Sequence, residues 1–456
     1  MKDYEEMARE VLKRRDAYQA SYSEKKKKQR IGVYGILVCL ALALTGTALY
    51  LYNGSMASVN AVDLMEGVMA KPVDGVTDLE YGNIKMTDFA VRLLQATREA
   101  APSAEKNLLL SPLSVLSALA MTGNGAENET LAEVETALGM KMGDLNQYLY
   151  SYYQSLPQWE TKYELKPANS IWFTDSSNFS VNPDFLQTNA DFYGADIYKA
   201  PFDKTTLKDI NHWVNDRTDG MIHGILNDLP EEAVMYLINA LAFDAQWDSI
   251  YRKDQVRKDT FTLEDGTQQT VEFMRCSEFQ YLEDAKVTGF LKYYLGEKYA
   301  FVALLPKEGV TVSEYVDSLD GTALHELLSA PTETLVYTAM PKFQTEYSVE
   351  MTDILKALGI TEAFDEEAAD FQSLGSARDQ LGQPVNLYIG QVLHKTYIAV
   401  DERGTRAGAA TAVAIGGGAG INNDIKEVYL NRPFVYMLID CENKVPFFMG
   451  ILESPK

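Results

Sequence analysis

No residue pattern that supports catalysis or metal binding is found in this 456-residue sequence. Its four histidines, at 212, 223, 325 and 394, form no HExxH motif, and no G-x-S-x-G elbow is present. The glycine run 416–418 is followed by no Lys-Ser or Lys-Thr pair and completes no G-x-G-x-x-G motif, which argues against phosphate binding. No cysteine and histidine spacing suggests a metal site. The sequence therefore predicts a protein that is not an enzyme and uses neither a cofactor nor a metal.

The segment with the most unusual composition is 404–414, in which every residue except Arg406 is small or β-branched. We expect it to carry the function. A flexible Ala/Gly linker would avoid the strand-forming Thr and Val residues found here. In a strand, alternate residues from Thr405 onward would share one face, and Arg406 would lie on the other. Such a segment can be an exposed loop and can also enter a β-sheet without steric obstruction.

The sequence patterns on either side of this segment predict one large domain of the α+β class, which would position it. Ser111 and Pro112 suit a helix start, because Ser is favoured as an N-cap and Pro at the first helical position. A second helix is expected over 129–138, and Asp265-Gly266 predicts a hairpin turn. The stretch 433–452 indicates two apolar strands. Helices followed by long strand-rich segments favour an α+β fold over a doubly wound sheet.

The first 52 residues differ sharply in charge from the rest. Residues 1–30 hold ten Lys/Arg and six Asp/Glu, whereas 31–52 contain no charged residue. A 22-residue helix is about 33 Å long, which is enough to cross a hydrocarbon core of about 30 Å. Because Lys25–Lys28 and Arg30 flank one side only, the positive-inside rule places residues 1–30 in the cytoplasm. The sequence thus predicts a single-pass cell membrane protein with an extracellular domain, or a secreted protein if this segment is cleaved.

Four parts are expected along the chain: a cytoplasmic basic tail over 1–30, a transmembrane signal-anchor over 31–52, a linker over 53–83 and the folded domain over 84–456. Residues 53–456 hold 59 acidic and 31 basic residues, so they should repel phosphate backbones, and a nucleic-acid partner is not expected. Cys39 lies in the apolar run, so at most one disulfide could join the other two cysteines, Cys276 and Cys441. Buried free thiols are the favoured interpretation.

Motifs throughout residues 84–456 resemble the serpin family of serine protease inhibitors, in a bacterial, membrane-anchored form. They occur in family order and cover nearly all of this range. The matching stretches are Asn107–Ser114, Ile210–Gly220, Asn239–Trp247, Met340–Phe343, Leu355–Phe364, Leu387–Ala407, Asn431–Phe434 and Pro446–Gly450.

The resemblance implies a serpin fold, with a large mixed main sheet, further β-sheets, about nine helices and an exposed reactive loop. A target protease attacks this loop and forms an acyl-enzyme. The cut loop then inserts into the main sheet as a new strand, which carries the protease along and distorts its active site. About 14 inserted residues at ~3.3 Å each would move the acylated end by ~46 Å. The expected protein is a monomeric suicide inhibitor of a serine protease, with a papain-like cysteine protease as a further possible target.

Family roles can be carried over residue by residue. The hinge of the loop matches Glu402, Gly404, Thr405, Ala407, Ala409, Ala410 and Thr411. The polar shutter cluster, beneath the strands that must part, matches Ser111, Ser114, Asn239 and His394. Trp247 matches the breach, where insertion begins. The reactive bond, about sixteen residues after Glu402, would be Gly418–Ala419, with Ile415 and Ile421 as neighbouring candidates because glycine is a poor specificity residue.

Two features of the loop bear on the target and on the alternative function. Residues 410–423 contain no Arg, Lys or aromatic residue, so an elastase- or subtilisin-like protease is expected as the target. Arg406 replaces the Glu usual in inhibitory members, but it should face solvent and have little effect. The alternative is a non-inhibitory serpin-fold surface protein, acting as a carrier, chaperone or structural protein. Such members tend to have bulky, charged or Pro residues in the hinge, whereas this chain has Thr405, Ala407, Ala409 and Thr411 there.

Overall fold

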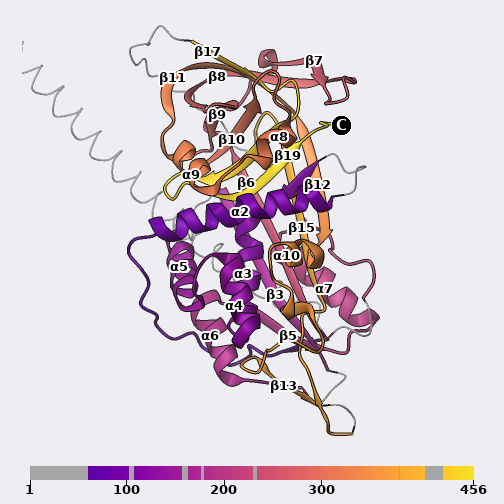
Figure 1. Cartoon of the computed structure of the whole chain (residues 1–456). Helices are drawn as coiled ribbons and strands as arrows, with labels where there is room; N and C mark the ends of the chain where they lie inside the picture. Colours follow the sequence, from indigo (N-terminus) through magenta and orange to yellow (C-terminus); the bar gives the residue numbers. More distant parts are fainter. Residues whose placement is uncertain are drawn as a thin grey trace, which may run out of the picture. The chain divides into compact units, whose positions relative to one another are not determined.

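The structure, a computed structural model, describes residues 60–101, 107–156, 163–175, 179–229, 234–378, 381–405 and 425–456. Residues 60–456 group into one compact unit, shown in Figure 1. The expected tail and membrane segment, residues 1–52, lie outside the described part of the chain. Among the helices that are described, none is both long and apolar enough to cross a membrane.

A seven-stranded main sheet positions the candidate hinge. Its order is β1 (Val62–Asp63), β5 (Asp196–Ala200), β3 (Tyr163–Thr174), β6 (Met235–Gln246), β16 (Gly404–Thr405), β15 (Gln391–Val400) and β12 (Phe343–Glu350). β6 is buried along almost its whole length, as expected for a central strand that is covered on both faces. The hinge residues therefore join the sheet at its centre rather than at an edge.

A second, nine-stranded sheet packs beside the first and holds much of the core. Its order is β17 (Lys426–Tyr429), β11 (Thr332–Pro341), β8 (Gln268–Glu283), β9 (Val287–Tyr293), β10 (Tyr299–Pro306), β18 (Phe434–Asp440), β19 (Val445–Leu452) and β2 (Leu108–Leu110), with β7 (Val256–Thr262) paired to β8. A small sheet contains β14 (Pro384–Val385), β13 (Gly375–Arg378) and β4 (Ser180–Val181).

The described part of the chain contains nine α-helices and two short 3₁₀ helices. The α-helices are α2 (Glu80–Ala100), α3 (Pro112–Gly123), α4 (Asn128–Leu138), α5 (Met142–Ser155), α6 (Pro183–Tyr193), α7 (Lys204–Arg217), α8 (Val312–Asp317), α9 (Gly321–Ser329) and α10 (Thr352–Ala357); the 3₁₀ helices are η1 (Lys253–Gln255) and η2 (Glu362–Phe364). Every residue of α3 is buried, and this helix packs against β3 and β6 of the main sheet.

The local expectations from sequence agree with these elements. Ser111 caps α3 by accepting a hydrogen bond from the Ser114 amide, and Pro112 is the first helical residue. Gly266 has φ of +83° in the turn between β7 and β8, a backbone conformation that favours glycine. The α+β class, the several sheets and the expected number of helices are thus confirmed for the described residues.

The sequence predicted a linker over residues 53–83, but residues 60–83 lie on the folded body. β1 pairs with β5 at the edge of the main sheet, and helix α2 already begins at Glu80. The carboxylate of Asp209, on α7, accepts hydrogen bonds from the amides of Asn60 at 2.7 Å and Ala61 at 3.2 Å. A strand of two residues is too short to give a periodic pattern, so this attachment could not be seen in the sequence.

Candidate functional site

The candidate site is the place in the main sheet where β16 lies between β6 and β15. The two long strands pair in parallel only from Gln391 opposite Tyr236 to Thr396 opposite Leu241. Beyond Thr396 and Leu241, toward the C-terminal ends of both strands, β16 lies between them, with Thr405 opposite both Ala245 of β6 and Val400 of β15. Gly404 and Thr405, both assigned to the hinge, thus already lie as a short strand between the ends of β6 and β15 that do not pair with each other.

Gly404 fits this position because it has no side chain. A Cβ atom added there would lie 2.0 Å from the carbonyl oxygen of Ala245 and 2.8 Å from the Cα of Gln246. Thr405, the next residue, is 1% exposed, and its hydroxyl shares a hydrogen bond with that of Tyr294. The small size of Gly404 and the inward orientation of Thr405 agree with the strand alternation expected from the sequence.

Trp247, expected at the breach, is fully buried directly beneath the hinge. Its ring stacks on Tyr294 with centroids 4.5 Å apart. Its indole N–H donates to the Asp401 carbonyl, and its backbone N–H donates to the Arg403 carbonyl, each at 2.8 Å. The Tyr251 backbone N–H donates to the Glu402 carbonyl at 2.9 Å. The turn 401–403, which precedes the hinge, is therefore held on one side by two aromatic residues.

The side chain of Glu402 forms an ion pair with Lys342, at 2.6 Å. The hydrogen bond from Lys342 holds the pKa of the Glu402 carboxyl below its usual value, although partial burial opposes this shift. Glu272 also contacts Lys342, at 3.3 Å. Lys342 lies between β11 and β12, so the start of the hinge is tied to both sheets.

The shutter residues Ser111, Ser114, Asn239 and His394 come together under the main sheet, and all four are completely buried. The Ser111 backbone amide donates to His394 Nε2 at 3.0 Å, and His394 Nδ1 contacts Asn239 Oδ1 at 2.5 Å. The Ser114 hydroxyl donates to the Ala240 carbonyl at 3.4 Å. The cluster thus links α3 to β6 and β15, the two strands that would have to part.

His394 is held as a neutral ring. Its Nε2 accepts a hydrogen bond, so the ring proton must be on Nδ1, from which it is donated to Asn239. Burial lowers the pKa of His394 to about 3, because a charged imidazolium would lose its hydration there. A neutral histidine of this kind can orient neighbours but cannot serve as a base that changes protonation near pH 7.

One polar residue beside this cluster was not expected from the sequence. Asn169 on β3 lies directly opposite Asn239 on β6. The buried atoms Asn169 Oδ1 and Asn239 Nδ2 each lack a hydrogen-bond partner among the described residues, and they are a complementary acceptor and donor. The signal in the sequence was an asparagine within the otherwise strand-like stretch Ala168-Asn169-Ser170-Ile171, but its partner is 70 residues away.

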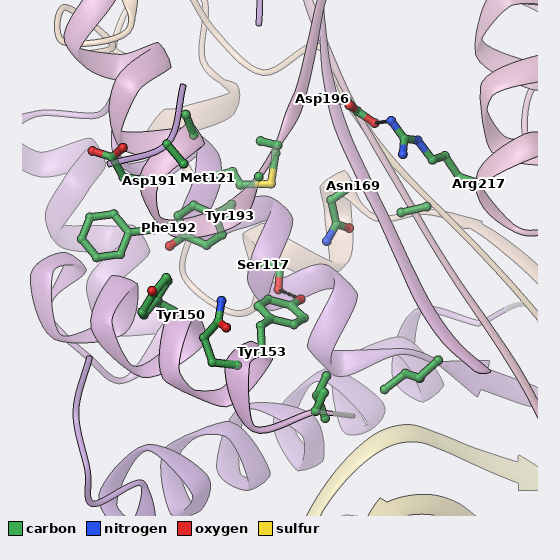
Figure 2. Close-up of a pocket in the computed structure, with 18 of the residues that line it drawn as sticks. Ser117, Met121, Tyr150, Tyr153, Asn169, Asp191, Phe192, Tyr193, Asp196 and Arg217 are labelled. Atoms are coloured by element: carbon green, nitrogen blue, oxygen red, sulfur yellow. Dashed lines mark hydrogen bonds and ion pairs between the residues drawn. The ribbon is translucent and has the colours of Figure 1, made fainter. Parts of the chain in front are cut away.

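Asn169 also lines a cavity of about 580 Å³ between α3, α5, α6, β3 and β5 (Figure 2). Tyr153 hydrogen-bonds to Ser117 on one side, and Arg217 forms an ion pair with Asp196 on another. The polar groups of these walls are thus largely satisfied by one another. The cavity thus lies beside β3, next to the strand that carries Asn169.

The rest of the predicted loop lies outside the described residues. This applies to the hinge residues Ala407, Ala409, Ala410 and Thr411, to the reactive bond Gly418–Ala419, and to the candidates Ile415 and Ile421. The chain is described again from Ile425, and β17 then pairs in parallel with β11. Cys276 and Cys441 are free thiols, each partly buried, and burial raises their pKa values, to about 11 and about 12.

Comparison with known proteins agrees with this geometry. The family model "Serpin (serine protease inhibitor)" matches residues 85–455. A thermophilic serpin, tengpin, is 46% identical in its native state, with a TM-score of 0.80 over 87% of this chain and 100% of tengpin. Its latent state gives a TM-score of 0.70 at 43% identity, over 85% of this chain and 100% of tengpin.

Two curated relatives are each 29% identical to this chain. The leukocyte elastase inhibitor of Equus caballus matches over 81% of this chain and 98% of its own length. A serpin-like protein of Thermococcus kodakarensis matches over 77% of this chain and 81% of its own length. With the family model covering most of the chain, and the hinge, breach and shutter residues gathered at the centre of the main sheet, this protein belongs to the serpin family.

Proposed function

We propose that this serpin is an inhibitor that traps a serine protease by insertion of its reactive loop. The observation that carries the proposal is β16: Gly404 and Thr405 already lie between β6 and β15, in antiparallel pairing with both. A loop that follows them can extend this strand downward, and every added residue would gain backbone hydrogen bonds to a strand on each side. The greater similarity to the native than to the latent state of tengpin supports an uninserted starting state.

The residues where β16 lies between β6 and β15 support fast insertion of the loop. Thr405 is small enough to be buried there, and the shutter residues are joined by hydrogen bonds rather than by a covalent bond or an ion pair. Insertion must outrun deacylation of the acyl-enzyme, so a low barrier to strand parting favours trapping over turnover. A hinge of Ala, Gly and Thr residues beyond Thr405 meets the same requirement.

For the target, we propose an extracellular elastase- or subtilisin-like protease. The loop sequence from 410 to 423 offers small and aliphatic residues to a specificity pocket and no basic or aromatic one. Residues 31–52 are proposed as the membrane anchor that keeps the inhibitor at the outer surface of the cell, with residues 1–30 inside. The acidic body, which carries no basic cluster like Lys25–Lys28, is compatible with export.

The test is incubation of residues 53–456 with a panel of elastase-, subtilisin-, chymotrypsin-, trypsin- and papain-like proteases, followed by a denaturing gel. A covalent band at the summed mass of inhibitor and protease is expected with elastase- or subtilisin-like enzymes. The same reactions with the catalytic serine, or the catalytic cysteine of the papain-like enzyme, blocked beforehand serve as the control and should give no such band. Cleavage without any covalent band across the whole panel would refute inhibition and favour the carrier, chaperone or structural role.

A further inference from the structure

A buried ammonium group lies behind the aromatic residues that hold the hinge. Lys292, on β9, is 1% exposed and is the one lysine among the described residues that is fully buried. Lysine is almost never buried in this way unless it is paired. Its Nζ donates to Glu278 Oε1 on β8 at 2.8 Å, and the Cys276 thiol donates to the same oxygen at 3.0 Å. The carboxylate is therefore fixed from two sides and points at the ammonium.

The ammonium also lies near two aromatic rings, those of Tyr251 and of Trp247, the residue assigned to the breach. Nζ lies 4.5 Å from the ring centroid of Tyr251 and 5.5 Å from that of Trp247, both within the range of cation–π attraction. Because all three groups are removed from water, the attraction is stronger than at a surface. The single charge of Lys292 thus acts on both residues whose N–H groups bind the turn 401–403.

We propose that Lys292 is a positioning residue for loop insertion: its ammonium holds Trp247 and Tyr251, and through them the turn 401–403, so that Gly404 enters the sheet between β6 and β15. The contacts form one continuous path. The ammonium contacts the two rings, three N–H groups of these residues bind the carbonyls of 401–403, and Gly404 follows directly. The importance of this position for trapping a protease rests on the proposed function.

A hydrophobic residue at 292 would fill the same space without the charge, which makes the role testable. The test variant is the double substitution Lys292→Met/Glu278→Gln, which removes the ammonium without leaving a buried carboxylate unpaired. The matched control is Lys307→Met/Glu283→Gln. It removes an ion pair of the same length, 2.8 Å, between Lys307, directly after β10, and Glu283, five residues further along β8; this pair is partly exposed and lies away from the hinge.

The first measurement is hydrogen exchange at the amides of Trp247 and Tyr251, which donate to Arg403 and Glu402. Loss of one or two cation–π contacts should speed exchange there by roughly two- to thirtyfold. The control should leave these amides unchanged even if its thermal midpoint falls. A lower midpoint in the test variant with unchanged exchange at both amides would overturn the proposal, because Lys292 would then be only a structural group.

The second measurement is the ratio of covalent adduct to cleaved inhibitor with a protease that the wild type traps. This ratio should fall by a similar factor in Lys292→Met/Glu278→Gln and stay unchanged in the control. An unchanged ratio in the test variant would overturn the role in insertion. If the wild type forms no adduct with any protease, the proposed function fails, whereas the exchange measurement still decides whether Lys292 positions the turn.

Discussion

Replacing Thr405 by arginine would test the hinge most directly. Thr405 is already inside the main sheet before any cleavage, with 1% of its surface exposed and its hydroxyl bonded to Tyr294. An arginine there would meet Tyr294 and the strands β6 and β15 rather than water. The substitution therefore acts on the resting protein as well as on the inserting loop, since both need this residue buried.

The size of the effect follows from burial of an unpaired charge. A guanidinium left without a partner in such a site costs about 3–5 kcal/mol, and the loop can escape this cost only by leaving the sheet. Insertion from that expelled state must bury the arginine again, and at about 1.4 kcal/mol per factor of ten this cost slows insertion by roughly 10²–10⁴. Deacylation of the acyl-enzyme is not slowed, so the protein should change from an inhibitor to a substrate.

The assay is densitometry of adduct and cleaved inhibitor on a denaturing gel, at several ratios of inhibitor to protease. Thr405→Arg should give almost entirely cleaved protein. Thr405→Ser, which keeps the hydroxyl for Tyr294, should give adduct close to the wild-type amount. If Thr405→Arg traps protease as efficiently as the wild type, the assignment of the hinge to this strand is wrong.

Three further outcomes are expected. Gly404→Ala should displace the hinge, because its Cβ would approach the Ala245 oxygen to 2.0 Å, and limited proteolysis within 401–411 should become faster; Gly143→Ala, with nothing within 4 Å of its Cβ, is the control and should not change it. For His394, the folded pKa of about 3 lies below the unfolded value of about 6.5, so the unfolded state binds more protons between these values and stability falls as the pH drops below 6.5. Urea unfolding at pH 6.5 and 5 should show a loss of up to about 2 kcal/mol from this group, which His394→Gln should abolish; an equal pH dependence in the variant would contradict it. Cell fractionation with an antibody to residues 1–30 should find the mature protein in the membrane, whereas protein in the medium that lacks this tail would mean cleavage and secretion.

Much of the candidate site could be predicted from the sequence, because its signals are local. Ser111 and Pro112 determine the start of α3 by capping and by the fixed backbone of proline, whatever packs around them. The hinge is recognisable because its residues are small and β-branched over one continuous stretch. Shutter residues scattered from 111 to 394 were assigned only through the resemblance, since no local rule joins a serine to a histidine 283 residues away.

The sequence by itself indicated the family, and it predicted the position of the hinge from the short residues that would let a strand enter the sheet. Only the tertiary structure decided that Gly404 and Thr405 are already inserted, that Asn169 faces Asn239, and that the ammonium of Lys292 is buried behind the breach. Each of these facts depends on the register between strands that are distant in the chain. The pattern of a strand shows which of its faces is buried. It does not show which residue of another strand lies opposite, because the packing of the whole sheet sets the register.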